Sequence, residues 1–547
     1  MDQRATSLIK TYERLVAQRQ PLEKHWDDCF RHSYPLRGGF LAKDSDGYAA
    51  AQQAARETAE RLSSVVTDSV RLLASSVLGA LTPSNQQWFS LAIPGVASDS
   101  IQYDAKQWLE TSSKVMFEQV HRVSNYDSVA LEFFVDEMVG GMAGLYVEKR
   151  DGRLYFEAWP LKSLYCADSL GSGYIDTIYR RVLFTASELV ARFGFANLPE
   201  PIQRSYNDDP YDTKQHEVIH AIRPRLSKNG KQVKGGKLNK NLPWESIYVL
   251  KASGSVINES GFHEMPVIVP RWSCIPDTDY AVGPMYDALP DAKTLNSVTQ
   301  FMMQNAELAI AGTFVAKDDG VISTSSLKIG PRKIIFAADT DSIKPLATGG
   351  NIQFAINEIA RLEGQIRRVL LADQLGPTDK QIMTATEVAS RTNLIQQILG
   401  PIFGRLQAEF LLPLITRIFG LLLRDGDLGT PPESLSGISA TVTYSSPLAN
   451  AQKLKQLQAM DQFEQRLATK AQAATEILDL YDIEAATRLQ AELLGVPVST
   501  IRDAKAVDKI RRQKAEAQAQ LAATQAAQEA QAATPPPTEQ QKLEPAL

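Results

Sequence analysis

The spacing of apolar residues changes twice along this chain of 547 residues, and these changes restrict its fold. Apolar residues recur at helical spacing from Leu8 to Gly140, which is the pattern of helices with one buried face, and a strand candidate follows at Leu145–Val147. From residue 154 to residue 271 the period is two, as in strands. Beyond Pro284 the helical period returns. The sequence therefore predicts a mainly α protein with an inserted antiparallel β subdomain, an α+β fold.

Short runs rich in Val, Ile, Tyr and Phe carry the period of two, and Gly, Pro, Asp and Asn separate them. The strand candidates are residues 154–156, 175–184, 217–223, 247–251 and 267–272. A hairpin candidate lies between two of these runs, with Asn229-Gly230 at its turn. It carries five lysines without a nearby acid: Lys228, Lys231, Lys234, Lys237 and Lys240. Two interpretations of this hairpin stay open: a solvated turn, and a contact with phosphate or with acidic protein.

Two helical patterns flank a stretch that has no helical period. The first follows Pro284, the second runs from Ile352 to Val369, and residues 312–346 between them are β-like. Such helices pair naturally as an antiparallel hairpin with the insertion at its tip. Pro290 predicts a break between a short lead-in turn and the main part of the first helix.

The stretch from residue 376 to residue 432 has distinct boundaries. Gly376-Pro377 marks a turn, and Thr384 with Glu387 forms a predicted capping box, in which each side chain satisfies a free amide at the start of a helix. A long apolar-periodic helix follows, and we expect bends in it near Pro401 and Pro413. A further helical block begins near Pro447, and residues 511–547 form an Ala/Gln/Pro-rich tail that is expected to be flexible.

Size and composition place the chain among ordinary globular proteins. It has 44% hydrophobic and 22% charged residues, and its length suggests two to four structural units. The three cysteines Cys29, Cys166 and Cys274 are far apart and odd in number, so they read as free thiols of a protein made in a reducing cytoplasm. The formal net charge of −5 gives no nucleic-acid footprint over the whole chain.

No signal peptide is expected, because the N-terminal segment is charged and lacks an apolar core. The most apolar run, from Phe410 to Leu423, is interrupted by Pro413 and Arg417 and is shorter than the roughly 20 residues of a membrane span. It is interpreted as a buried helix, and no membrane insertion is expected.

Candidate metal sites in the sequence are weak. His25, Cys29 and His32 share one helical face, but no fourth ligand supports a metal site. His216 and His220 lie in a predicted strand, where a spacing of four residues does not bring two ligands together. Turn-forming neighbours surround Asp277 and Asp279, which favours a turn over a Mg²⁺ site.

Signatures of catalysis are also missing from the sequence. The Gly140-Gly141 and Gly144 run lacks the Lys-Ser/Thr of a phosphate-binding loop, so a packed turn is the better interpretation. No nucleophile elbow, zinc-protease motif or dinucleotide fingerprint occurs. We therefore expect no catalytic residue, no metal, no cofactor and no enzyme activity.

The order of these features resembles the head-to-tail connecting (portal) proteins of short-tailed, T7-like bacteriophages over roughly residues 8 to 500. The most specific parts are residues 376–432, the run from Tyr280 to Tyr286 that leads into Asp291, and the helix 352–371. The lysine hairpin and the Ala/Gln tail are not part of the resemblance. It implies a twelve-subunit ring built of wing, stem, clip and crown, with an axial channel for DNA packaging and ejection.

The resemblance divides the chain as follows: 1–280 wing with the β-rich insertion at about 154–272, 281–311 first stem helix, 312–346 clip, 347–371 second stem helix, 372–383 tunnel loop, 384–446 long wing helix and return strand, 447–510 crown, and 511–547 tail.

The resemblance also implies roles for individual residues. Residues nearest DNA are expected in the tunnel loop: Asp373, Gln374, Lys380 and Gln381. Candidates for the channel lining or the subunit interface are Asp287, Asp291 and Glu307 in the first stem helix and Arg361, Arg367 and Arg368 in the second. Contacts with partners are expected at the clip through Lys328, Arg332, Lys333 and Lys344.

The implied partners are eleven further copies of the chain in a homododecamer, double-stranded DNA, the terminase large subunit, the tail adaptor and tube proteins, and the major capsid and scaffolding proteins. The implied location is the unique capsid vertex of the virion, after assembly in the cytoplasm of the host bacterium. Two alternatives stay open at this point: another ring-forming virion scaffold without a DNA channel, and a helical enzyme with an unrecognised site.

Overall fold

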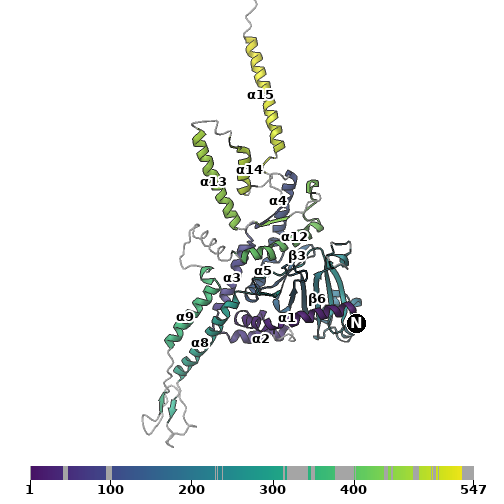
Figure 1. Cartoon of the computed structure of the whole chain (residues 1–547), viewed down its shortest axis with the longest axis vertical. Helices are drawn as coiled ribbons and strands as arrows, with labels where there is room; N and C mark the ends of the chain where they lie inside the picture. Colours follow the sequence, from purple (N-terminus) through teal and green to yellow (C-terminus); the bar gives the residue numbers. More distant parts are fainter. Residues whose placement is uncertain are drawn as a thin grey trace, which may run out of the picture. The chain divides into compact units, whose positions relative to one another are not determined.

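A computed structural model gives the fold of the chain (Figure 1). It describes residues 2–40, 47–93, 102–311 apart from five positions between 228 and 237, 314–316, 343–345, 352–375, 400, 402–435, 441–444, 447–471, 480–494, 496, 500–502 and 504–532. The chain divides into two compact units. Unit 1 comprises residues 1–92, 113–430 and 440–448, and unit 2 comprises residues 93–112, 431–439 and 449–547.

The helices of unit 1 that precede or interrupt the sheets are α1 (Gln3–Ser33), α2 (Gly47–Ala59), α3 (Val65–Leu81), α5 (Tyr126–Gly140), α6 (Ala186–Phe193) and α7 (Glu200–Asp208). Those that follow are α8 (Met285–Ala311), α9 (Ile352–Val369), α10 (Ala372–Leu375) and α12 (Leu412–Asp425). Helix α4 (Tyr103–Glu118) continues into a π-helical turn, Gln119–Val123. The helices α13 (Pro447–Ala471), α14 (Ile483–Leu494) and α15 (Ala504–Ala532) complete the described chain.

The β subdomain consists of two antiparallel sheets. Strands β4 (Leu164–Ala167), β5 (Thr177–Thr185), β6 (Gln215–Pro224), β7 (Trp244–Leu250) and β8 (Ser255–Phe262) form a five-stranded sheet in sequence order. Strands β2 (Gly144–Arg150), β3 (Arg153–Trp159) and β9 (Val267–Ile268) form a three-stranded sheet in the order β3-β2-β9. The smaller pairs are β1 (Phe89–Ala92) with β14 (Thr441–Tyr444), β10 (Ser273–Cys274) with β11 (Ala281–Val282), and β12 (Phe314–Ala316) with β13 (Ile343–Pro345).

Helices cover both faces of the five-stranded sheet. Ala5, Leu8, Tyr12 and Leu15 of α1 share one buried cluster with residues such as Ile219 of β6. On the other face, α6 and α7 share a second cluster with Val218, the residue that precedes Ile219 in β6. That second cluster contains Ala186, Leu189, Leu198, Ile202, Val218, Leu250 and Ile257. Because successive residues of a strand point to opposite faces, α1 and the α6–α7 pair lie on opposite sides of the sheet.

The mainly α fold with an antiparallel insertion is confirmed, as is the period of two in the insertion. The sequence pattern missed β4, β8, α6 and α7. Strand β8 lies at the sheet edge and contains polar residues and Gly261, which weakens its alternation. Helix α6 begins at a capping box formed by Thr185 and Glu188, a signal that the sequence contained.

Two expectations about prolines have different outcomes. The predicted break at Pro290 is wrong, because α8 is one continuous helix with Pro290 in its second turn. A proline there removes only one backbone donor, and the Thr294 hydroxyl donates to the Pro290 carbonyl at 2.9 Å. Near Pro413 the helix is irregular as expected, since a π-helical turn, Gln407–Leu411, directly precedes α12. Pro401 lies outside the described residues.

One other boundary differs from expectation. The segment expected as a loop from residue 372 begins with the short helix α10, after Leu371 in the left-handed conformation at φ +57°. The described part of the tail, as far as Ala532, is helical within α15, whose residues 506–525 are largely exposed, and the flexibility of the tail stays a prediction. Alanine is the strongest helix former, which accounts for a helix that has no apolar face to bury.

Within the described part of the chain, the helical segment Ile402–Asp425 is long and apolar enough to cross a membrane by length and composition, and it is half buried. It is longer than the apolar run seen in the sequence, because the π turn joins two helical pieces. Arg417 and Glu409, both buried in this segment, form ion pairs with Glu264 and Arg271 of unit 1. Buried ion pairs with the protein body are typical of a core helix, which agrees with the sequence interpretation.

The glycine run before β2 is a packed turn, as expected. Gly141 has φ +85°, and a side chain there would collide with the backbone of Val282 and Gly283. Gly283 in turn lies against the carbonyls of Glu137 and Met138 at the end of α5. Two backbone segments therefore touch where no β-carbon fits.

Candidate functional site

Helices α8 and α9 pack side by side and carry the pair β12–β13 beyond their far ends, as Figure 1 shows. The expected antiparallel helix hairpin is confirmed. At its base, the buried residues Met285, Leu289 and Leu295 of α8 face the body of unit 1. Lys293 Nζ lies 2.7 Å from Asp28 Oδ2 of α1, and the Leu62 amide donates to Asn296 Oδ1 at 3.0 Å. The base of the hairpin is thus fixed to the helices of the body.

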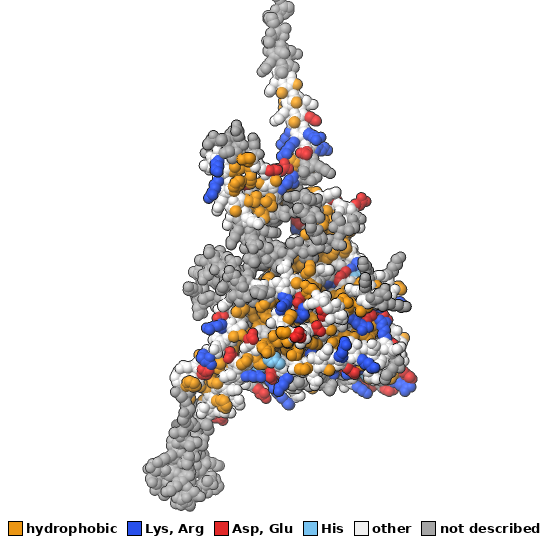
Figure 2. All heavy atoms as spheres, in the orientation of Figure 1, with side chains coloured by type: hydrophobic (Ala, Val, Ile, Leu, Met, Phe, Trp, Pro, Cys, Tyr) orange, Lys and Arg blue, Asp and Glu red, His pale blue; other side chains and the backbone are white. Residues whose placement is uncertain are grey.

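The far end of the hairpin exposes large apolar side chains. Phe301 and Met303 of α8 are 62% and 51% exposed, and Phe354 and Ile356 of α9 are 67% and 47% exposed. Figure 2 shows hydrophobic side chains on this arm next to the part of the chain that is not described. Exposed apolar side chains gathered on one element are typical of sites of protein–protein contact.

The charged residues expected on the stem helices are solvent-accessible. Asp287, Glu307, Arg361, Arg367 and Arg368 are exposed, and Asp291 is half-buried. The hydrogen bond that Arg361 donates to the Glu358 carboxylate raises the pKa of Arg361, and the negative charge of Asp291 adds to this effect from α8. Arg367 lies 3.6 Å from Glu363. Two of the three arginines are therefore paired within the hairpin, which makes their face less adhesive to phosphate.

The residues expected in the tunnel loop and at the clip are only partly described. Asp373 is exposed and Gln374 is half-buried, both on α10, and Lys344 lies on β13 opposite Val315. The remaining candidates lie outside the described residues: Lys380, Gln381, Thr384, Glu387, Lys328, Arg332 and Lys333. Of the lysine hairpin, only Lys240 is described, and it is exposed. Gly230 has φ +72°, as the expected turn requires.

The candidate metal-binding residues do not form a metal site among the described residues. His25 Nε2 lies 3.5 Å from Cys29 Sγ, and burial raises the pKa of this thiol to about 12, so it stays protonated. Burial lowers the pKa of His220 well below its usual value, and its ring stacks on Tyr248 with centroids 3.9 Å apart. Asp277 lies in a turn at φ +58°. No group of three potential metal ligands comes together among the described residues.

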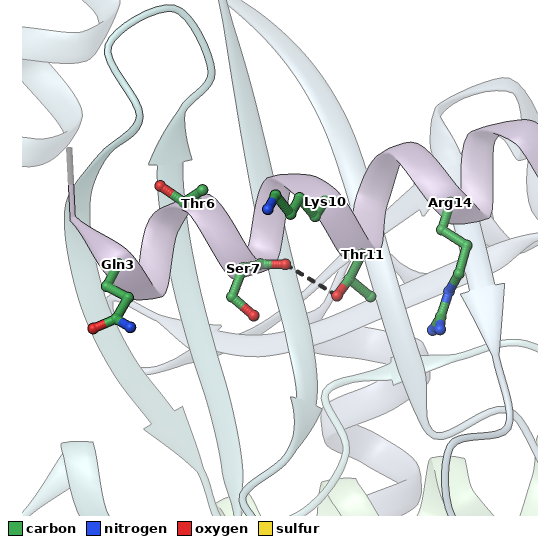
Figure 3. Close-up of a pocket in the computed structure, with 6 residues that line it drawn as sticks. All are labelled: Gln3, Thr6, Ser7, Lys10, Thr11 and Arg14. Atoms are coloured by element: carbon green, nitrogen blue, oxygen red, sulfur yellow. Dashed lines mark hydrogen bonds between the residues drawn. The ribbon is translucent and has the colours of Figure 1, made fainter.

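Two surface hollows lined by described residues contain no catalytic arrangement. One of about 670 Å³ lies along α1 and is lined by Gln3, Thr6, Ser7, Lys10, Thr11 and Arg14 (Figure 3). Its one internal hydrogen bond is local, from the Thr11 hydroxyl to the Ser7 carbonyl at 3.1 Å. A smaller hollow of about 230 Å³ lies between α3 and α9, where Glu363 and Arg367 meet Ser63 and Asp68. Neither contains a nucleophile activated by a neighbouring base.

Sequence reasoning missed the residues that fix the hairpin and the long helix to the body. Lys293 and Asn296 lie in α8, the helix of three expected lining residues, but their partners are more than 200 positions away. Arg271 holds Glu409 of the π turn through Nη2 and Oε1 at 2.9 Å, across 138 positions. No local pattern identifies such pairs.

Comparison with known proteins identifies the family of the chain. The profile of the family described as "Bacteriophage head to tail connecting protein" matches residues 5–501. The portal protein of Salmonella phage epsilon15 is 27% identical over 527 residues, which cover 94% of this chain and 92% of that protein. The probable portal protein of Bordetella phage BPP-1 is 24% identical over 537 residues, which cover 96% of this chain and 92% of that protein. With a family match over nearly its whole length, the chain belongs to the bacteriophage head-to-tail connecting proteins.

Proposed function

We propose that the chain is the subunit of a phage portal, a ring of twelve copies whose axial channel carries double-stranded DNA during packaging and ejection. The names of the two relatives support this proposal, since both are described as portal proteins. The observation that carries it is the α8–α9 hairpin, whose base is fixed to the body and whose far end exposes Phe301 and Phe354. A ring supplies neighbours that cover these side chains.

The proposed stem consists of α8 and α9, the clip of residues 312–346, the wing of residues 1–280 and 384–446, and the crown of residues 447–510. Twelve copies, each with a formal net charge of −5, give a ring that repels phosphate, so DNA can slide. The paired state of Arg361 and Arg367 supports the same behaviour in the stem.

The proposed tunnel loop, 372–383, carries Lys380 near DNA, together with Asp373, Gln374 and Gln381. Each contact of Lys380 with phosphate is weak and salt-dependent, but twelve such contacts add up. The loop would then act as a valve that holds packaged DNA.

The proposed partners bind at the clip and at the capsid vertex. Lys328, Arg332, Lys333 and Lys344 would attract acidic surfaces of the terminase large subunit and then of the tail adaptor, which gives salt-sensitive association. The tail tube, the major capsid protein and the scaffolding protein complete the set of partners. Assembly would take place in the cytoplasm of the host bacterium. No ATPase or nuclease activity is part of this proposal.

Electron microscopy of negatively stained purified chain tests the proposal. Rings with a central hole are expected, and light scattering should give a mass of many subunits. A monomer or dimer would contradict the ring. Closed particles without a hole would instead favour a scaffold protein.

A further inference from the structure

Two hollows of unlike charge lie on opposite outer sides of the five-stranded sheet. The first is the hollow of about 670 Å³ on the outer face of α1, where the charged residues are Lys10 and Arg14 (Figure 3). The second, of about 410 Å³, is lined by Glu200, Pro201, Arg204, Ser205, Asp208, Asp209, Asp212 and Lys214. Four acids against two bases give the second hollow a net negative charge.

The fold explains why the two hollows cannot meet within one chain. Leu8 and Tyr12 of α1 pack against one face of the sheet, so Lys10 and Arg14 point away from it. Leu198, which precedes α7, and Ile202, which lies within α7, pack against the other face of the sheet. The sheet and its two buried layers therefore separate the basic hollow from the acidic one.

The charges in the two hollows are available for a partner. Lys10 and Arg14 are exposed and form no ion pair with the residues that the structure describes. Asp208 is exposed at the end of α7 and likewise has no ion pair in the described part of the chain. Glu200, by contrast, is paired with Arg204 at 2.5 Å.

An exposed aromatic side chain accompanies the acidic hollow. Tyr211 is 89% exposed and lies between Asp209, which accepts its amide at 2.9 Å, and Asp212. The Asp212 carboxylate accepts the Lys214 amide at 2.9 Å, so the segment has a fixed turn. Tyrosines are enriched at protein interfaces, because they bury a large area with few rotatable bonds.

We propose that the basic hollow on α1 of one subunit docks against the acidic hollow around α7 of the next subunit in the ring. This inference rests on the proposed portal ring. A ring of identical chains needs two different, complementary patches on each subunit, since head-to-tail contacts are heterologous. The two hollows meet this requirement, because their charges have opposite signs and they lie on opposite sides of one sheet. Tyr211 would be covered in the contact.

Charge reversal tests the contact. The α1 variant Lys10→Glu/Arg14→Glu and the α7 variant Asp208→Lys/Asp209→Lys each place like charges opposite one another. The fraction of chain in rings at low salt should fall roughly tenfold or more in each. The variant that combines all four changes restores opposite charges and should recover most of the rings. The control Lys24→Glu/Arg153→Glu makes the same net change as the α1 variant at two exposed positions outside both hollows and should assemble normally.

Zero-length cross-linking supplies a second readout on the unaltered chain. A carbodiimide joins an amine and a carboxylate that are in contact, with loss of water. In rings assembled from a mixture of unlabelled and ¹⁵N-labelled chain, mass spectrometry should find Lys10 linked to Asp208 or a neighbouring acid of a different chain. The sheet prevents the same link within one chain.

The possible results of these experiments distinguish the proposed contact from the proposed ring. Equal ring formation by all variants, with no link between Lys10 and the acidic hollow, would overturn the contact and leave the ring intact. Loss of capsid incorporation with normal rings would overturn it as well, because another protein then occupies the hollow. A wild-type chain that stays monomeric would overturn the ring and this contact together.

Discussion

Arg417 of α12 forms an ion pair with Glu264, with Nη1 and Oε2 3.1 Å apart; the arginine side chain is 3% exposed and that of Glu264 is 24% exposed. Arg424 binds the same carboxylate from the more exposed side, at 2.6 and 2.7 Å. Burial opposes ionisation of Glu264, but these two arginines outweigh it and lower its pKa. Gly420 makes room for the carboxylate, since a side chain there would collide with it. Helix α12 is thereby fixed to the segment that joins β8 and β9.

Removal of Glu264 should destabilise unit 1 strongly. Glu264→Ala leaves Arg417 buried without its partner, and loss of one member of a buried pair costs about 3 kcal/mol. Arg424→Gln is the control, because this arginine is 35% exposed and its pair should contribute at most about 1 kcal/mol. The midpoint of thermal unfolding measures both. Equal shifts for the two variants would mean that Arg417 does not depend on Glu264.

The carboxyl group of Glu137 should make stability depend on pH. It is fully buried, both oxygens lack a hydrogen-bond partner in the described structure, and burial together with the charge of Glu409 raises its pKa well above the usual value. The folded state therefore keeps a proton that the unfolded state releases above about pH 4.3. This contribution to stability is complete below that pH and is lost as pH rises towards the folded pKa.

Glu137→Gln should remove this dependence. As pH rises from about 5 to about 8, roughly the range above the pKa of the unfolded state, the unfolding midpoint of the variant should rise relative to that of wild type. Glu13→Gln, an exposed change on α1, is the control and should follow wild type. A constant difference between Glu137→Gln and wild type over this range would contradict a retained proton.

Gly141→Ala should be far more damaging than Gly152→Ala. Both glycines have positive φ, at +85° and +76°, so both substitutions cost about 1 kcal/mol in backbone strain. Only at Gly141 does the new methyl group collide with backbone, that of Val282 and Gly283, and overpacking adds about 1–3 kcal/mol. Unfolding midpoints of the two variants give the comparison. Similar midpoints would show that the 281–283 segment can move away.

The exposed phenylalanines of the hairpin should matter for assembly and not for folding. Phe301→Ser and Phe354→Ser change side chains that are 62% and 67% exposed, so the subunit's own stability should change by less than about 0.5 kcal/mol. The proposed ring, in contrast, should form less completely, as light scattering would show. Leu36→Ser, at a position 68% exposed on the body, is the matched control. Normal ring formation by both phenylalanine variants would show that these stem side chains are not part of the subunit interface.

Lys380 should hold packaged DNA if the tunnel loop is a valve. Lys380→Glu is expected to leave assembly and the start of packaging intact but to let DNA slip out, because twelve attractive contacts become repulsive. The DNA content of filled particles, before and after a salt challenge, measures retention. Thr384→Ala is the comparison, since loss of the predicted cap should cost about 1 kcal/mol of helix stability without changing the charge of the loop. Wild-type retention in Lys380→Glu particles would exclude the valve.

The order and kind of the main elements can be predicted from the spacing of apolar residues alone. The helical period gave α1, α8 and α9, and the period of two gave β5, β6 and β7, because one-sided burial leaves its mark on residues a few positions apart. The flanking of residues 312–346 by two helical runs was enough to predict their hairpin. The resemblance to head-to-tail connecting proteins rested on the same order of elements, and the family match confirms it.

Contacts between distant residues, in contrast, depend on how the whole chain folds. Glu264 and Arg417 are 153 positions apart, and Gly141 touches Gly283 through backbone contact that no local pattern encodes. Whether α1 and α7 lie on one face of the sheet or on opposite faces depends on how the strands pair and on the faces that the helices cover. Local spacing indicates that one face of an element is buried. The topology of the chain determines which other surface covers that face. The positions of the two charged hollows depend on this topology.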